Sequence, residues 1–202
     1  MLRVMNTITK QPLATNKELF TLAHALSPAE CAKMIAWAET KGFGDAPVTV
    51  GVNRYMMIPD LRNNTRVMID DPALAAQLWP RVAPFMPQRI GAYAPVGLNE
   101  RFRYYRYEPG QQFDWHRDGS FVRSDEEQSF LTLLFYLNDD CEGGTTDFMY
   151  VANDDIQVVP QIGMGLVFSH PLYHRGAPVV SGKKYVLRTD VMYQRVASLY
   201  AH

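Results

Sequence analysis

Cysteine is scarce in this sequence. The 202 residues include only Cys31 and Cys141, and neither forms part of a Cys-x-x-Cys pair. So few cysteines exclude a scaffold held together by disulfides and are typical of a protein in a reducing compartment. We therefore expect a cytoplasmic protein whose fold is stabilised by an apolar core.

A strong net charge and long apolar runs are also missing. The formal net charge is -1 at pH 7, so the composition predicts no general attraction to nucleic acid or to an anionic membrane. No apolar run is long enough for a transmembrane helix, and residues 1–20 lack the apolar centre of a signal peptide. We expect no nucleic-acid and no membrane partner, and the sequence leaves the oligomeric state open.

Internal repeats, low-complexity segments and obvious linkers are absent as well. With 47% hydrophobic residues, a chain of this length can bury the core of one domain. We therefore expect a single domain over residues 1–202. Within it we expect a helical N-terminal support region, residues 1–90, and a β-rich catalytic core, residues 91–202.

The first helix is predicted by its capping residues. Ser27 precedes Pro28, and Glu30 can reach back to the cap, which is the pattern of a capping box. The helix should continue to about Thr40, where Gly42 ends it. The positions expected to face the core are Cys31, Ala32, Ile35 and Ala36.

A second helix is predicted after a short strand over residues 66–69. It begins at Asp71 and Pro72, and its apolar stripe ends before two prolines. The residues of the stripe, which we expect in the core, are Leu74, Leu78, Trp79 and Val82.

From about residue 91 the apolar residues alternate instead of following a helical period. Short apolar segments separated by Gly and Pro are typical of a β-barrel or sandwich, here backed by two helices. The expected strands cover residues 101–107, 130–137, 143–148, 156–159, 165–169 and 184–193.

A candidate metal site lies in residues 113–119. His116 and Asp118 are two residues apart, so in extended chain their side chains point to the same face. A second imidazole from a distant strand would complete a 2-His-1-carboxylate set, which suits non-haem Fe(II). His170 and His174 are the candidates for this third ligand.

Five segments together resemble a known family. They are residues 107–118 (YEPGQQFDWHRD), 131–138 (LTLLFYLN), 143–148 (GGTTDF), 160–168 (PQIGMGLVF) and 174–185 (HRGAPVVSGKKY). In this order they resemble the Fe(II)/2-oxoglutarate-dependent dioxygenases, in particular the prolyl 4-hydroxylase-like branch.

The resemblance implies a fold and a metal site. The fold would be mainly β with flanking helices (α+β), with a double-stranded β-helix, or jelly-roll, packed against the N-terminal helices. Iron would be held by His116, Asp118 and His174. His170 would lie outside the ligand set, at the surface or behind the ligands, and His24 and His202 would be solvated.

The resemblance also implies a site for the distal carboxylate of 2-oxoglutarate. Lys184 occupies the place of the family's cation, and Arg188, on the same face of the strand, is its rival. The hydroxyl of Tyr136 matches a further partner of this carboxylate, and Tyr107 matches a position near the metal-bound end. Thr132 shares a strand face with Tyr136 and could line the same pocket.

Three further positions have less specific assignments. Arg103 and Tyr105 share a strand face with Tyr107 and would contact substrate or cover a sheet face. Asp147, in the segment GGTTDF, would have a structural role or support the site from behind. No catalytic residue beyond the metal ligands is implied.

The implied activity is hydroxylation of an unactivated C–H bond, of a prolyl or other amino-acid side chain, with release of succinate and CO2. Fe(II), 2-oxoglutarate and O2 would be required, with ascorbate as an optional reductant. The substrate would be a small molecule or a protein side chain, contacted by the loops at 43–64 and 119–130. Alternatives are a small-molecule hydroxylase unrelated to proline, a non-catalytic jelly-roll module that binds metal or senses, and a cupin-like metal enzyme without 2-oxoglutarate.

Overall fold

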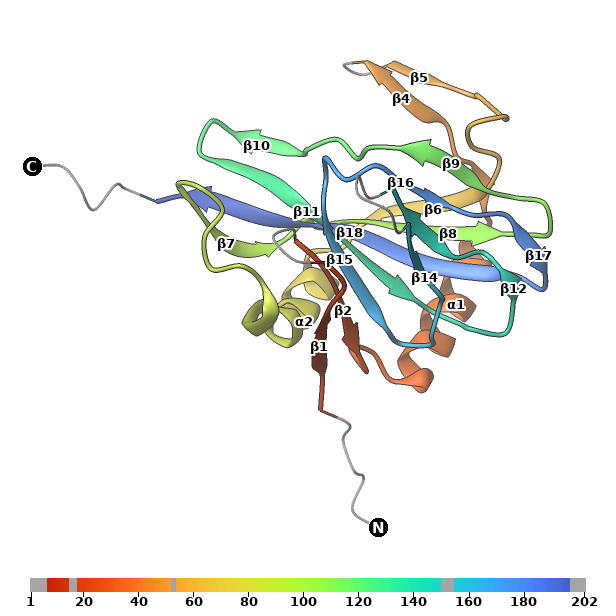
Figure 1. Cartoon of the computed structure of the whole chain (residues 1–202), viewed down its shortest axis with the longest axis horizontal. Helices are drawn as coiled ribbons and strands as arrows, with labels where there is room; N and C mark the ends of the chain where they lie inside the picture. Colours follow the sequence, from red (N-terminus) through yellow and green to blue (C-terminus); the bar gives the residue numbers. More distant parts are fainter. Residues whose placement is uncertain (1–6, 15–17, 52–53, 150–154, 197–202) are drawn as a thin grey trace, which may run out of the picture.

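One large β-sheet runs through the whole protein (Figure 1). The computed structural model describes residues 7–14, 18–51, 54–149 and 155–196. The large sheet, called the major sheet below, has the order β1-β2-β15-β11-β18-β8-β6-β3, with β10 beside β11 and β7 beside β18. Its strands are β1 (Thr9–Pro12), β2 (Leu19–Ala23), β3 (Gly44–Asp45), β6 (Thr65–Asp70), β7 (Tyr93–Leu98), β8 (Arg101–Tyr107), β10 (Val122–Ser124), β11 (Glu127–Tyr136), β15 (Gly165–Ser169) and β18 (Lys184–Arg195).

A smaller sheet of four strands faces the major sheet. Its order is β14-β13-β16-β9, and it is called the minor sheet below. From β8 onward the principal strands alternate between the two sheets, except that β13 and β14 follow each other as a pair within the minor sheet. This is the connectivity of a double-stranded β-helix. The predicted fold class is therefore confirmed. The strands of the minor sheet are β9 (Phe113–His116), β13 (Thr146–Phe148), β14 (Ile156–Val158) and β16 (His174–Gly176).

The alternation of side chains along β11 explains why this strand is central. Leu131, Leu133 and Phe135 point into a core shared with the helices. Leu134 and Tyr136 point the other way, into a second core between the two sheets. Both faces of the major sheet are thus covered, and the strand is an almost continuous apolar run.

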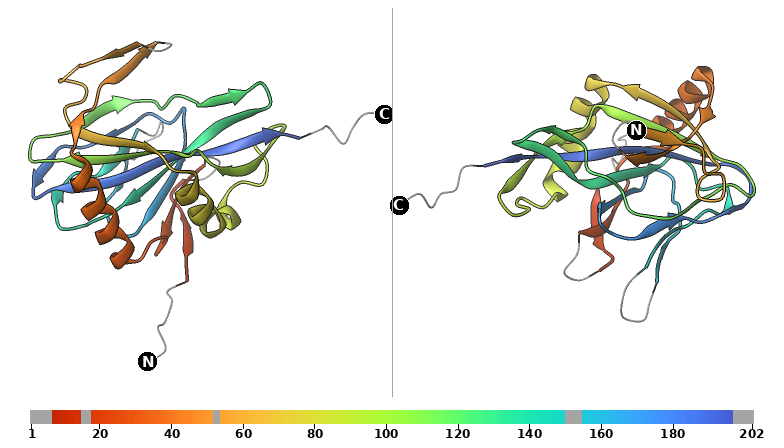
Figure 2. Two further views of the ribbon diagram at one scale, coloured as in Figure 1. Left: turned by 180° about the vertical axis from the view of Figure 1, so that it is seen from behind. Right: turned by 90° about the horizontal axis from the view of Figure 1, so that it is seen from above.

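Both helices cover the outer face of the major sheet (Figure 2). α1 (Pro28–Lys41) begins with the predicted capping box of Ser27 and Glu30. It ends at Gly42, whose φ of 75° suits a residue without a side chain. α2 (Pro72–Val82) is followed by the 3-10 helix η1 (Ala83–Phe85). No helix among the described residues is both long and apolar enough to cross a membrane.

The predicted inner face of α1 is partly wrong. Cys31 is buried as expected, but Ala32 and Ala36 are exposed, and Ala38 is buried instead. Alanine is small enough to be tolerated on either face. The orientation is set by larger side chains, because Trp37 packs against the ring of Tyr104 on β8, with ring centroids 5.2 Å apart.

The segment before residue 91 supplies more than helices. It contributes β1, β2, β3 and β6 to the major sheet, in addition to α1 and α2. It also forms the hairpin of β4 (Val48–Gly51) and β5 (Arg54–Met56), which stands off from the body beyond β9 (Figure 1). A last short ladder joins β12 (Glu142–Gly143) to β17 (Val179–Ser181). The N-terminal segment is therefore part of the same sheet as the C-terminal core.

Candidate active site

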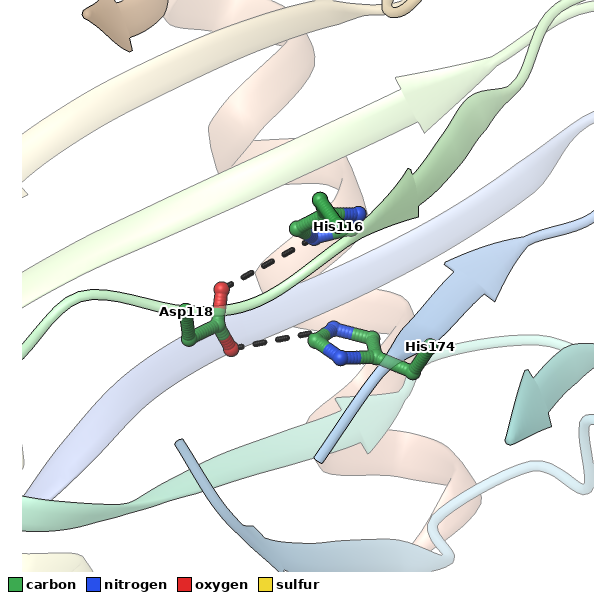
Figure 3. Close-up of side chains that lie close together, drawn as sticks. All are labelled: His116, Asp118 and His174. Carbon is green, nitrogen blue, oxygen red and sulfur yellow. Dashed lines mark ion pairs between the residues drawn. The ribbon is translucent and has the colours of Figure 1, made fainter. Parts of the chain in front are cut away.

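Three side chains meet where β9 and β16 pair in the minor sheet. His174 is directly opposite His116 in the register of these strands, and Asp118 follows two residues after His116. The ligand atoms of these residues all lie within 4.8 Å of one another (Figure 3). Nε2 of each histidine is 3.8 Å from a different carboxylate oxygen of Asp118. The structure thus brings together the three residues expected to hold iron.

Each histidine is held in the tautomer that a metal ligand needs. Nδ1–H of His116 donates to the carbonyl of Asp114 at 2.6 Å, and Nδ1–H of His174 donates to the carbonyl of Leu172 at 2.9 Å. Burial lowers the pKa of both imidazoles, that of His116 to about 3. Both rings are therefore neutral at pH 7, with the Nε2 lone pair free for a divalent cation.

The third ligand, Asp118, is fixed as a carboxylate. Burial alone would raise its pKa, but the guanidinium of Arg188 and the two imidazoles outweigh burial and hold the pKa below its ordinary value. Arg188 Nη1 lies 2.9 Å from Oδ1. The hydroxyl of Thr132 donates to Oδ2 at 2.6 Å. The donor set and its charge fit Fe(II), and the supporting bonds orient the ligand.

Thr132 has a different role from the one expected, whereas His170 takes one of the two roles expected for it. Thr132 bonds Asp118 and does not line the cavity. His170 is 3% exposed rather than at the surface, and it lies between Ser129 Oγ at 2.9 Å and Thr132 Oγ1 at 3.0 Å. It also accepts the backbone N–H of Asp118 at 3.1 Å. His170 therefore stands behind the ligands and fixes the threonine that orients Asp118.

A cavity of about 40 Å³ extends from the metal ligands into the space between the sheets. Lys184 lines it together with the three ligands, and its side chain is buried. The ammonium lies over the rings of Tyr107 and Tyr136, 5.2 Å and 5.6 Å from their centroids. Among the described residues no carboxylate lies within 4 Å of it, and burial lowers its pKa to about 8. The other lining residues are Tyr105, Tyr107, Phe113, Leu134, Thr146, Phe168, Gly176, Val186 and Arg188.

Arg188 lines the same cavity, but its guanidinium is already engaged. Besides Asp118 it contacts Asp190, with Nη2 3.5 Å from Oδ1. Tyr136 is fully buried, and its hydroxyl donates to Thr146 Oγ1 at 2.7 Å. Tyr136 therefore does not line the cavity itself but holds Thr146, which does.

The remaining predicted residues lie at different distances from the cavity. Tyr105 lines the cavity, whereas Arg103 does not and lies 3.6 Å from Asp190. Asp147 is buried, accepting the hydroxyl of Thr145 at 2.6 Å and Nε of Arg175 at 2.9 Å. This ties β13 to β16 and is the structural role that was expected. His24 is exposed as expected, and His202 lies outside the described residues.

Two contributors were not expected from the sequence. Phe113 stacks on His116, with ring centroids 3.5 Å apart. The guanidinium of Arg62 lies between the rings of Phe113 and Tyr105, 4.4 Å and 4.6 Å from their centroids. The aromatic at the start of FDWH was visible in the sequence. The loop at 43–64 was expected to contact substrate, but nothing in it singled out Arg62.

Comparison with known proteins agrees with this geometry. The family model of the 2OG-Fe(II) oxygenase superfamily matches residues 102–189. A protein of Acanthamoeba polyphaga mimivirus named "Putative prolyl 4-hydroxylase" is 27% identical over 186 residues, 83% of this chain and 71% of that protein. Prolyl 4-hydroxylase 1 of Arabidopsis thaliana is 26% identical over 209 residues, 92% of this chain and 72% of that protein.

Solved structures show the same fold. The viral collagen prolyl hydroxylase of Paramecium bursaria Chlorella virus-1, in complex with 2-oxoglutarate, has a TM-score of 0.63 and 23% identity, covering 91% of this chain and 99% of its own. A Pseudomonas putida prolyl-4-hydroxylase has a TM-score of 0.62 and 16% identity, covering 90% and 95%.

The fold and the His-Asp-His site together define a 2OG-Fe(II) oxygenase, an enzyme that uses Fe(II), 2-oxoglutarate and O2. Within this superfamily the two relatives named as prolyl 4-hydroxylases support the prolyl 4-hydroxylase-like branch that the sequence predicted. The family, the enzyme class and the cofactors predicted from the sequence are confirmed.

Proposed function

We propose that the enzyme hydroxylates an unactivated C–H bond of a prolyl or other amino-acid residue. The observation that carries the proposal is that the three metal ligands and the buried Lys184 line one cavity. Bound Fe(II), 2-oxoglutarate and O2 supply the oxidising chemistry, and succinate and CO2 are the co-products. The two relatives that are named as prolyl 4-hydroxylases support a prolyl or related substrate.

Lys184 binds the distal carboxylate of 2-oxoglutarate in this proposal. Its ammonium is buried and has no carboxylate of the described residues within 4 Å, so a carboxylate of the co-substrate would complete a charge-assisted hydrogen bond. Arg188 is less suited because Asp118 and Asp190 already occupy its guanidinium. Thr146, held by the hydroxyl of Tyr136, lies in the same cavity and offers the carboxylate a further donor.

The rest of the cavity positions the substrate and excludes water. Phe113, Leu134 and Phe168 give it apolar walls, and three ligands on one face leave the other metal positions open. We further propose that the enzyme acts in the cytoplasm on a small molecule or a protein side chain.

The metal assignment is tested by Asp118→Ala. We expect loss of iron affinity and a fall in succinate production of more than ~100-fold, because the one anionic ligand of the three and a carboxylate partner of Arg188 are removed together. The measurement is succinate release with Fe(II), 2-oxoglutarate and ascorbate. Near-normal production by this variant would exclude the assignment.

The same assay separates the alternatives. A non-catalytic metal-binding or sensing module would release no succinate under any condition. A cupin-like enzyme would oxidise its substrate without consuming 2-oxoglutarate. The control variant is Arg81→Gln, which removes a charge from the ion pair with Glu30 between the two helices, away from the cavity.

A further inference from the structure

Four guanidinium groups, those of Arg62, Arg66, Arg103 and Arg188, gather around Tyr105. Of the four, Arg188 lines the cavity itself, and Tyr105 lines it as well. Arg66 is directly opposite Tyr105 in the pairing of β6 with β8, and Arg103 is directly opposite Arg188 in the pairing of β8 with β18. Opposed residues of an antiparallel pair share a face, and so do residues two apart on one strand. All three arginines therefore lie on the face of Tyr105, whose ring also contacts Arg62.

Arg62 is the most deeply buried of the four. Its side chain belongs to a residue that is 4% exposed, and its Nε donates to Asn64 Oδ1 at 2.8 Å. Its Nη2 is buried and has no hydrogen-bond partner. Since Phe113 stacks on both Arg62 and His116, this unpartnered donor lies one ring away from a metal ligand.

The carboxylates near these arginines do not balance them. Asp190 lies 3.6 Å from Nη1 of Arg103 and 3.5 Å from Nη2 of Arg188, and Asp118 is needed by the metal. Among the described residues, Arg62 and Arg66 form no ion pair at all. Nη1 of Arg103 and Nε of Arg188 are buried without hydrogen-bond partners as well.

The excess of positive charge lowers the pKa of Tyr105, which lies at its centre. Burial would raise the pKa of Tyr105, but Arg62, Arg188 and Arg103 outweigh burial and lower it. Arg66 has its own pKa lowered by burial, and the neighbouring Arg62 and Arg103 lower it further. Buried donors without acceptors are costly, so a ligand that brings acceptors and negative charge is favoured here.

The co-substrate does not supply that ligand in the function proposed above. Its distal carboxylate is bound by Lys184 and its other end by the metal. We infer that the substrate itself carries a carboxylate close to the carbon that is oxidised, and that Arg62, Arg66 and Arg103 bind this carboxylate. The inference rests on the proposed function. A free amino or imino acid, or the carboxyl-terminal residue of a peptide, has this chemistry, whereas an internal residue of a neutral peptide does not.

The substrate class is tested with matched probes. The standard amino acids are offered as free acids, as α-amides, and as the last or an internal residue of a short neutral peptide. We expect a free acid or a carboxyl-terminal residue to stimulate succinate release. Comparison of the free acids with the peptides shows whether the carboxylate belongs to a free amino acid or to the end of a peptide. Calorimetry with Mn(II) and 2-oxoglutarate bound should give at least ~tenfold weaker binding for the matching amide.

Two results of this comparison would overturn the inference. One is an amide or an internal residue that binds as tightly as its free acid. The other is failure of every carboxylate probe to bind. Failure of the proposed function looks different, because no probe and no condition would then give any metal-dependent succinate, even at the slow rate without substrate.

The arginines are tested one at a time with Arg62→Gln, Arg66→Gln and Arg103→Gln. Each should weaken binding of the stimulating acid about tenfold or more, leave its amide unaffected, and leave the affinity for 2-oxoglutarate unchanged. Arg81→Gln should change none of these. If Arg62→Gln does not fold, the inference is tested by Arg66→Gln and Arg103→Gln, because these two arginines are only half-buried. Weakened 2-oxoglutarate binding with unchanged acid binding would assign the arginines to the co-substrate and overturn the inference.

Discussion

At the scale of single residues, Lys184 links co-substrate binding to pH. Its pKa is lowered by burial to about 8 in the free enzyme, so it loses its proton as the pH rises through this value. The neutral amine binds a carboxylate poorly, and bound carboxylate raises the pKa again. We therefore expect the Kd for 2-oxoglutarate to be nearly constant below pH 8 and to rise ~tenfold per pH unit above it.

Calorimetry with Mn(II)-substituted enzyme between about pH 7 and pH 9.5 measures this dependence. The control is Lys184→Arg, which carries a charge throughout the range and should remove the dependence even if its longer side chain binds less tightly. A Kd that stays flat in the native enzyme would point to Arg188 as the partner, since its pKa is raised by Asp118 against the effect of burial.

The residues of the site differ in how far the sequence could predict them. His116, Asp118 and His174 were predictable because a two-residue spacing fixes one face of a strand, and the family motifs identify the third ligand. The role of Thr132 was not predictable. Its hydrogen bond to Asp118 forms only because the fold places β11 beside the loop that follows β9. Arg62 was not singled out within the loop at 43–64, because it precedes β6 and reaches the site through contacts with two aromatic rings.

At the scale of elements, local sequence patterns predicted where a helix or strand begins and ends better than which of its faces is buried. The capping box fixed the start of α1, and Gly42 fixed its end, because both depend on neighbours in the chain. The buried face of α1 depends on β8 and on Trp37, which no local pattern encodes, so the alanines were assigned wrongly. For β8 the predicted bounds match the observed ones, since a turn follows it directly, closed by the N–H of Gln111 donating to the carbonyl of Glu108.

The capping box also gives a stability prediction at this scale. Ser27→Ala removes the acceptor for the backbone N–H of Glu30 and the hydroxyl that donates to its carboxylate. We expect the free energy of unfolding to fall by about 1 kcal/mol, measured by urea denaturation. Ser120→Ala, at an exposed loop position, is the matched control and should have no effect. An unchanged midpoint for Ser27→Ala would show that the cap contributes nothing.

At the scale of the whole molecule, the N-terminal segment and the catalytic core share one sheet and one helix-facing core. β6 pairs with β8 over six residue pairs, and β2 pairs with β15. Removing residues 1–90 would leave both partners with unpaired edges and would expose the apolar face formed by Phe102, Leu131 and Leu133.

A fragment of residues 91–202 should therefore not fold on its own. We expect it to aggregate or to lack the cooperative thermal transition of the full chain, as followed by circular dichroism. A soluble fragment with a cooperative transition and bound Mn(II) would show that residues 91–202 are an independent unit and that the N-terminal segment only supports it.

The alternation along β18 has a consequence for how the enzyme can change over generations. Lys184, Val186 and Arg188 line the cavity, while Leu187 and Val191 lie in the core under the helices. Inserting or deleting one residue inside this strand would exchange the two sets and ruin cavity and core together. Substitutions in β18 can be selected one at a time, but its length cannot drift, so variation in length among descendants is confined to the turns that border it.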